Sequence, residues 1–218
     1  MPARGAARQG RVEAINGLKR SLILDAARKV FERDGLEGAS LRAIAAEAGY
    51  TPAALYFHFA SKETIYAEML EASLSSLRAL VENRMSDEQS PRNRFRAAAF
   101  AFFDFYAKNP RDLDLGFYLF RGGMKPKGLG RERNKALNAA LAAALRPIAT
   151  AAEELGASTN EAKVLMVEIF AHAAGLLLLS HTRRIRMFGV RAPELMTQYI
   201  DGCIAHLEGK PQHANDET

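Results

Sequence analysis

Residues 40–59 read SLRAIAAEAGYTPAALYFHF, and this stretch decides the fold that we expect. Ser40 is a good helix N-cap, and it opens a short helix with small alanines on its inner face. Gly49 ends that helix, because glycine accepts the positive φ that a short turn can require. Thr51 and Pro52 then begin a second short helix over residues 52–59, as its N-cap and first helical residue. Two short helices joined by a tight turn predict a helix-turn-helix, whose second helix enters the DNA major groove.

The rest of the chain also reads as helix. Apolar residues recur three and four positions apart, and no long alternation of period two is present, so the predicted fold class is all-α. A first helix ends at Asp34-Gly35, and Ser61 caps a long helix that follows the motif. Further helices are expected over residues 91–108, 111–120, 131–155, 159–182 and 193–208, with a glycine-rich loop over 121–130.

Composition and charge narrow the class of protein. The chain has 218 residues, 48% of them apolar and 25% charged, which is ordinary for a globular protein and excludes wholesale disorder. Residues 1–62 carry ten Lys or Arg and six Asp or Glu, so they hold +4 of the net charge of +5. A basic N-terminal part on a nearly neutral body indicates contact with a polyanion. The single cysteine excludes an intrachain disulfide and favours a reducing, cytoplasmic location.

Several function classes lack their motifs. The longest apolar stretch, residues 164–179, is interrupted by Glu168 and His172, so we expect no membrane span. His172 and His181 show no metal-ligand spacing, and we find no nucleophilic triad and no glycine-rich phosphate loop. We therefore expect no enzyme, no cofactor and no metal. Two alternatives stay open: a helical small-molecule or lipid-binding protein or enzyme without regulatory DNA binding, and a nonspecific DNA-coating protein.

About residues 20–66 resemble the TetR family of dimeric, ligand-responsive transcriptional repressors. The matching positions are Ser40, Ile44-Ala45, Ala48-Gly49, Thr51, Leu55-Tyr56, His58-Phe59, Ser61 and Lys62-Glu63. Two positions depart from the family pattern: Tyr50 replaces a small aliphatic residue, and Ala53 replaces glycine. Because Ala53 and Ala54 are apolar, the second motif helix has few side chains that hydrogen-bond base edges.

Composition and the resemblance together indicate four segments, and the resemblance implies a mode of action. We expect a flexible basic arm (1–18), a helix-turn-helix DNA-binding domain (19–66), a larger helical ligand-binding and dimerisation domain (67–208) and a disordered tail (209–218). The implied function is a dimeric, sequence-specific repressor that a small apolar or aromatic ligand releases from a palindromic operator. Helices 159–182 and 193–208 are expected to pair with those of a second subunit, the alternative being burial within one subunit.

The DNA contacts follow from the motif and from the resemblance together. Tyr56 and His58 fall where the family contacts the DNA backbone, and the Lys62 ammonium is expected on a phosphate. Arg42 either reads a guanine or is solvated or paired with a phosphate. The full set of expected DNA-binding residues is Ser40, Arg42, Tyr50, Thr51, Pro52, Ala53, Tyr56, His58 and Lys62.

Each of these assignments has a plainer alternative. Ser40 and Thr51 either touch phosphates or only cap their helices. Tyr56 is otherwise a half-buried core aromatic, and His58 a surface histidine. The arginines of the N-terminal arm either enter a minor groove or attract DNA without specificity; they are Arg4, Arg8 and Arg11.

The resemblance also implies an effector cavity in the C-terminal body. Aromatic residues at helical spacing are expected to line it, together with a few polar residues that orient the ligand. The alternative is that the same aromatic stripe is simply core. The candidate ligand-binding residues are Phe102, Phe103, Tyr106, Phe117, Phe120, Asn138, Leu141, Met166, Phe170 and His172.

Overall fold

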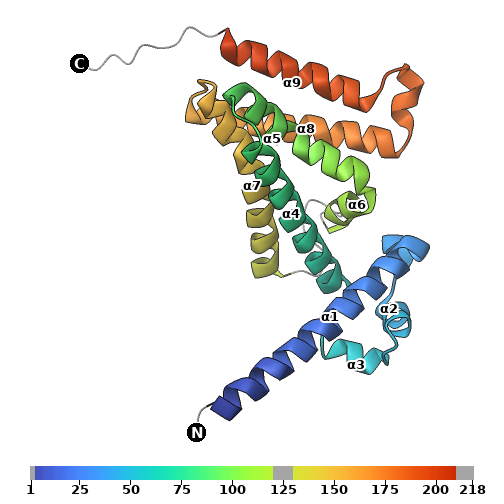
Figure 1. Ribbon diagram of the computed structural model, residues 1–218. Helices are drawn as coiled ribbons and strands as arrows, with labels where there is room; N and C mark the ends of the chain where they lie inside the picture. Colours follow the sequence, from blue (N-terminus) through green and yellow to red (C-terminus); the bar gives the residue numbers. More distant parts are fainter. Residues whose placement is uncertain (1–2, 120–129, 210–218) are drawn as a thin grey trace. The chain divides into compact units, whose positions relative to one another are not determined.

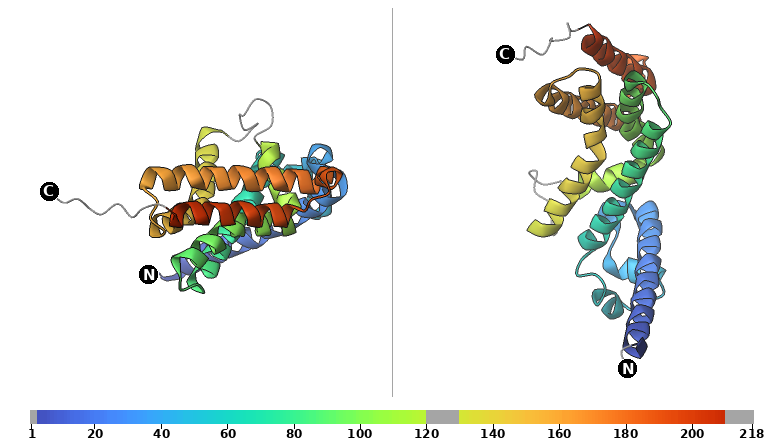
Figure 2. Two further views of the ribbon diagram at one scale, coloured as in Figure 1. Left: turned by 90° about the horizontal axis from the view of Figure 1, so that it is seen from above. Right: turned by 60° about the vertical axis from the view of Figure 1, so that its left-hand side comes forward.

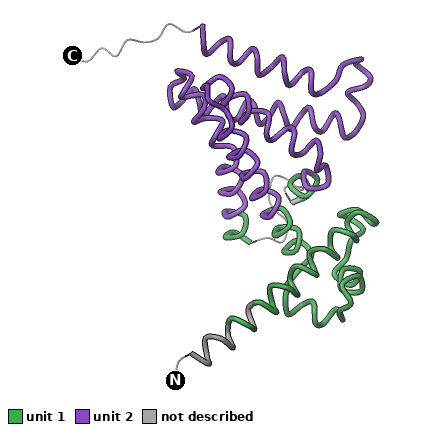
Figure 3. The backbone as a smooth tube through the Cα atoms, in the orientation of Figure 1, with its two compact units in different colours: residues 1–70, 114–134 green, residues 71–113, 135–218 purple. Residues whose placement is uncertain are grey.

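The computed structural model describes residues 3–119 and 130–209, and within them the fold is all-α, as predicted (Figure 1). The helices are α1 (Ala3–Gly38), α2 (Leu41–Glu47), α3 (Pro52–Tyr56), α4 (Lys62–Ser86), α5 (Pro91–Lys108), α6 (Pro110–Leu119), α7 (Arg131–Glu154), α8 (Thr159–His181), the 3-10 helix η1 (Arg184–Phe188) and α9 (Ala192–Glu208). They form two compact units, coloured separately in Figure 3. Unit 1 comprises residues 1–70 and 114–134, and unit 2 comprises residues 71–113 and 135–218.

Unit 1 is a small helical domain in which α2 packs against α1 and α3 packs against α2 (Figure 1). Its core is formed by fully buried aliphatic side chains on consecutive helices, including Ile23, Val30, Ile44 and Leu55. Gly35 interrupts α1 with φ 70° and ψ 170°, so the predicted stop is present. The left-handed region of φ explains why glycine occupies this position.

A segment distant in sequence completes unit 1. The carboxylate of Glu68 on α4 accepts hydrogen bonds from Arg20 on α1 and from Arg133 at the start of α7. Tyr118 of α6 lies edge-on to the buried Tyr66, with ring centroids 5.6 Å apart. The structure therefore groups residues 114–119 and 130–134 with the N-terminal unit, whereas the sequence placed them in the domain over residues 67–208.

Two further expectations need correction. Residues 3–18, predicted to be a flexible arm, form the beginning of α1. The second motif helix ends at Tyr56, three residues earlier than predicted, and the chain then turns to bury Phe59. Most of the expected loop 121–130 and nearly all of the tail 209–218 lie outside the described residues.

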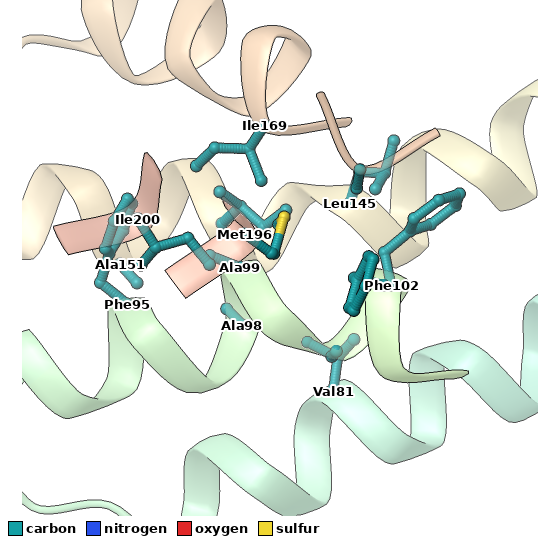
Figure 4. Packing of buried hydrophobic residues seen from close by; sticks show 14 of the residues in the cluster. Val81, Phe95, Ala98, Ala99, Phe102, Leu145, Ala151, Ile169, Met196 and Ile200 are labelled. Carbon is teal, nitrogen blue, oxygen red and sulfur yellow. The ribbon is translucent and has the colours of Figure 1, made fainter. Parts of the chain in front are cut away.

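Unit 2 is a helical body whose core receives side chains from seven helices, α4 to α9 and η1. Figure 4 shows Val81 of α4, Phe95 of α5, Leu145 of α7, Ile169 of α8 and Met196 of α9 around one cluster. Small buried alanines on α5 let neighbouring helices approach closely. Fully burying each large side chain contributes about 1.5–3 kcal/mol, so this cluster is the main source of stability for the unit.

Helix α8 is far more apolar than its burial requires. It lies beside α9 (Figure 2), and Ile169, Ala173 and Leu177 on its inner face are fully buried. The most apolar 18-residue stretch of α8 has a mean hydropathy of 1.8, but only 28% of that stretch is buried. By length and composition α8 is the one helix of the described chain that is long and apolar enough to cross a membrane. Its exposed apolar side therefore needs an explanation.

Candidate nucleic-acid interface

The second motif helix, α3, is anchored on one side and free on the other. Leu55 is fully buried, and it fixes the helix on the core of unit 1. Thr51 caps the helix, because its Oγ1 accepts a hydrogen bond from the amide of Ala54 at 3.2 Å. Thr51, Pro52 and Ala53 are exposed. The start of α3 is thus held in place while its first residues face solvent.

The turn before α3 has the predicted geometry. Gly49 has φ 74°, and the amide of Tyr50 donates to the carbonyl of Ala45 at 2.8 Å. Ser40 caps α2 in the same manner as Thr51 caps α3, with its Oγ accepting from the amide of Ala43 at 3.2 Å. The capping roles of Ser40 and Thr51 are therefore confirmed, and their phosphate contacts remain predictions.

Two aromatic side chains extend from the end of α3. Tyr56 is 58% exposed and Phe57 is 90% exposed, whereas His58 is half-buried and Phe59 is buried. The plainer alternative for Tyr56, a half-buried core aromatic, is wrong. Phe57 is not among the DNA-binding residues predicted from the sequence. Its position between Tyr56 and His58 in the motif could have indicated it.

Arg42 is the free cation of the motif. It lies exposed on α2, and within the described chain its guanidinium has no hydrogen bond or ion pair. The neighbouring Arg33 is paired with Asp34 at 2.9 Å and with Glu47 at 3.4 Å. The hydrogen bond from Arg33 lowers the pKa of Asp34, so this acid is ionised at neutral pH and offsets the charge of Arg33. Arg42 can therefore donate both guanidinium edges to an external acceptor.

Lys62 has partners within the protein. Its ammonium donates to the carbonyl oxygens of Leu36 and Ala39, each at 3.1 Å, and to that of Glu37 at 3.4 Å. It also lies 5.6 Å from the centroid of the Tyr118 ring. An ammonium has three hydrogens, and all three are occupied. The structure thus gives Lys62 a different set of acceptors from the expected phosphate.

Residues 23–69 match the family described as bacterial regulatory proteins of the tetR family. These residues therefore form a helix-turn-helix domain of the tetR type. Among curated proteins the chain is similar to the transcriptional activator FasR of Mycolicibacterium smegmatis, with 37% identity over 87 residues, or 40% of each chain. It is also similar to the transcriptional repressor NicS of Pseudomonas putida, with 29% identity over 42% of this chain and 43% of that one. The matched region therefore spans less than half the length of these relatives.

Solved structures extend the likeness of this chain beyond the motif. A Rhodococcus protein of unknown function superimposes with a TM-score of 0.70 and 25% identity over 87% of this chain and 95% of that one. The TetR family regulator PfmR of Thermus thermophilus superimposes with a TM-score of 0.55 and 25% identity, over 84% of this chain and 93% of that one. FadR of Bacillus subtilis, solved in complex with stearoyl-CoA, superimposes with a TM-score of 0.63 and 16% identity, over 85% of this chain and 97% of that one. The last of these shows a common fold alone.

The expected effector residues divide into two groups. Phe102, Phe103 and Tyr106 are buried on α5, and the ring of Phe170 on α8 meets Phe102 at 5.1 Å. Burial raises the pKa of Tyr106 to about 12, so its hydroxyl stays protonated. Leu141 and Met166 pack against the same core. These six form one aromatic cluster in unit 2.

The other expected effector residues lie elsewhere. Asn138 is exposed on α7, and Phe117 is 44% exposed in unit 1. His172 stacks on Tyr199 at 4.0 Å, in a groove of about 780 Å³ between α8 and α9. Phe120 lies outside the described residues. The structure therefore does not bring Asn138 or His172 to the aromatic cluster, because helical spacing alone does not say which neighbour a face meets.

Proposed function

We propose that this TetR-family protein is a cytoplasmic regulator that binds a palindromic operator as a homodimer and is released from it by a small apolar ligand. The observation that carries the proposal is the exposed face of α3 behind a rigid glycine turn. That face presents Thr51, Pro52 and Ala53 on a helix that Leu55 anchors. A short anchored helix of this kind fits the major groove.

Base readout rests on few side chains. Pro52 and Ala53 offer only apolar contacts, which suit thymine methyl groups. Arg42 is the cation able to make a bidentate contact with guanine, and such a contact discriminates by about 1–3 kcal/mol. Tyr56 and Phe57 extend apolar and phenolic surface alongside α3. Part of the specificity is therefore expected to come from DNA shape, which is read through the backbone.

Dimerisation is supported by the free side of α8. Val164, Val167 and Leu178 are each at least half exposed on that helix. Exposed apolar patches on soluble proteins mark interaction surfaces. A two-fold partner that covers α8 and α9 gives two copies of α3, and paired reading helices fit successive major grooves about 34 Å apart. This arrangement explains the apolar excess of α8 without a membrane.

The effector proposal rests on the aromatic cluster around Phe102 and Phe170. A ligand that separates these rings shifts the protein toward the state to which it binds more tightly. The neighbour from Bacillus subtilis is a complex with stearoyl-CoA, so a long-chain acyl-CoA is a suitable first probe. FasR is a transcriptional activator and NicS is a transcriptional repressor, so regulation of either sign occurs among the relatives. We assign repression.

The test is to capture fragmented chromosomal DNA with the purified full-length protein and to sequence it. The expected result is enrichment of one palindrome with half-sites one helical turn apart. A transcription assay on that palindrome should show repression that a small apolar ligand relieves, and stearoyl-CoA serves as a probe whose acyl chain is apolar. Equal recovery of all sequences would refute a dedicated operator, and activation in the assay would refute the assigned sign.

A further inference from the structure

Unit 2 contains a second candidate binding site, which shares no residue with the aromatic cluster. A cleft of about 650 Å³ is lined by the last turns of α4, the connection to α5, the first turn of α5 and the middle of α7. This volume lies in the range of sites that hold small molecules. Met85 and Pro147 supply apolar surface within it. Most of the other lining side chains are polar. Those that have no hydrogen-bond or ion-pair partner within the protein indicate which kind of ligand the cleft binds.

Three arginines from three helices line the cleft. Arg78 of α4 donates to Glu82 at 2.7 Å, so its charge is neutralised within one helix. Arg94 of α5 pairs with Glu154 at 3.1 Å through Nη2. Arg146 of α7 is exposed, and it has no hydrogen bond or ion pair among the described residues. Arg146 is therefore available to a ligand.

Two further groups in the cleft lack partners. Nε of Arg94 is buried and has no hydrogen-bond acceptor. The carboxylate of Glu88, at the turn between α4 and α5, has no partner within the described part of the chain. A buried donor without an acceptor is costly, and a ligand that supplies the acceptor removes that cost. The unmatched groups are thus guanidinium donors and one carboxylate acceptor.

We propose that this cleft binds a small amino acid-like zwitterion with an apolar side chain. Its carboxylate is recognised by Arg146, because a guanidinium matches the planar geometry of a carboxylate, and Arg94 shifts so that its buried Nε also donates to that carboxylate. Its ammonium is recognised by Glu88, and its side chain lies on Met85 and Pro147. A simple anion would accept hydrogen bonds from the arginines, but the negative charge of Glu88 would repel it. The site does not depend on the proposed DNA-binding function.

The test is isothermal titration of the full-length protein without DNA, using phenylalanine and two analogues that each lack one charged group. Phenylalanine should bind saturably, and 3-phenylpropanoate and phenethylamine should bind at least about tenfold more weakly, since each loses a charged hydrogen bond. Absence of saturable phenylalanine binding would overturn the proposal. Equal affinity for 3-phenylpropanoate would also overturn it, because Glu88 would then have no role.

Three variants locate the binding. Arg146→Gln and Glu88→Gln change unpaired side chains at the surface of the cleft, so the fold should persist, and each should weaken phenylalanine binding at least about tenfold. Arg186→Gln removes an exposed arginine of η1, outside the cleft, and should leave the affinity within about twofold. Binding that survives both cleft substitutions would place phenylalanine elsewhere and refute the site.

Discussion

The Lys62 ammonium lies 3.1 Å from the carbonyl oxygen of Ala39, the residue directly before the N-cap of α2. The same ammonium holds the carbonyl of Leu36 just beyond the interruption of α1 at Gly35. Leu36 and Ala39 both lie between the interruption of α1 and the start of α2, and Lys62 donates to their carbonyls from α4. It therefore fixes where α2 begins, and through α2 it positions the reading helix.

Lys62→Met tests this role. The substitution keeps the apolar stem but leaves the carbonyls without their donor, so the free energy of unfolding should fall by about 1–3 kcal/mol in denaturant titrations. DNA affinity should fall for all sequences, while its dependence on salt should stay unchanged. A salt slope lowered by about one unit would instead place the ammonium on a phosphate. Lys29→Met, which changes an exposed lysine of α1, serves as the control.

Gly49→Ala tests the turn. A Cβ at this position meets open space, so only the positive φ of 74° opposes it. The expected cost is about 1–2 kcal/mol in thermal unfolding, with loss of DNA affinity as the turn adjusts. Gly17→Ala is the matched control, because Gly17 lies within α1 and also has no atom near its Cβ. That substitution should stabilise the protein by up to about 1 kcal/mol, and destabilisation by both would remove the special role of Gly49.

Arg42→Ala tests direct base readout. Selection from random duplexes should show relaxed preference at one base position, equivalent to about 1–3 kcal/mol, with the other positions unchanged. Arg28→Ala removes an exposed arginine of α1 and should leave the selected sequence as it is. Identical sequence preferences for Arg42→Ala and the unaltered protein would reduce Arg42 to a general electrostatic contribution.

Val167→Lys tests the assembly. Val167 is 56% exposed on α8, so the fold of one subunit tolerates the charge, whereas an apolar interface does not. Sedimentation equilibrium should show a dimer for the unaltered protein and a largely monomeric variant. Met187→Lys, at an 80% exposed position of η1, should remain dimeric. A monomeric unaltered protein would contradict the proposed two-fold arrangement.

The stability should depend on pH through His172. Desolvation lowers the pKa of this histidine below its ordinary value of 6.5, so the unfolded chain binds its proton more readily than the folded chain. Stability therefore falls as the pH drops from about 7.5 through 6.5, down to the lowered pKa of the folded state. His172→Phe keeps a ring against Tyr199 and should flatten this part of a melting-temperature curve. An unchanged slope would assign the pH dependence to another group.

The local parts of the fold were predictable because short-range chemistry fixes them. Ser40, Gly49 and Thr51 act on amides or dihedrals within three residues of themselves, and each performs the predicted role. The bounds of α5 were predicted from Pro91 and from the Asn109-Pro110 break, and the structure has the same bounds. Caps and breaks are readable from sequence, since their partners are adjacent in it.

The long-range parts were not predictable in the same way. Lys62 meets acceptors that lie more than twenty residues earlier, and Glu68 joins Arg20 to Arg133 across most of the chain. The helical content of residues 3–18 was missed because their apolar content is low, although alanine and arginine favour helix on their own. Helical period shows that a face is apolar, but it does not say which helix covers that face.

The role of α3 as the reading helix can be measured by fluorescence anisotropy, with the full-length protein and double-stranded DNA at low ionic strength. We expect tight binding by the unaltered protein, and a loss of at least about a hundredfold for Ala53→Glu, whose carboxylate would enter the groove beside α3. Circular dichroism should show the same helical content for both proteins. If the folded, unaltered protein bound no duplex, or if Ala53→Glu bound DNA equally well, α3 would not be the reading helix.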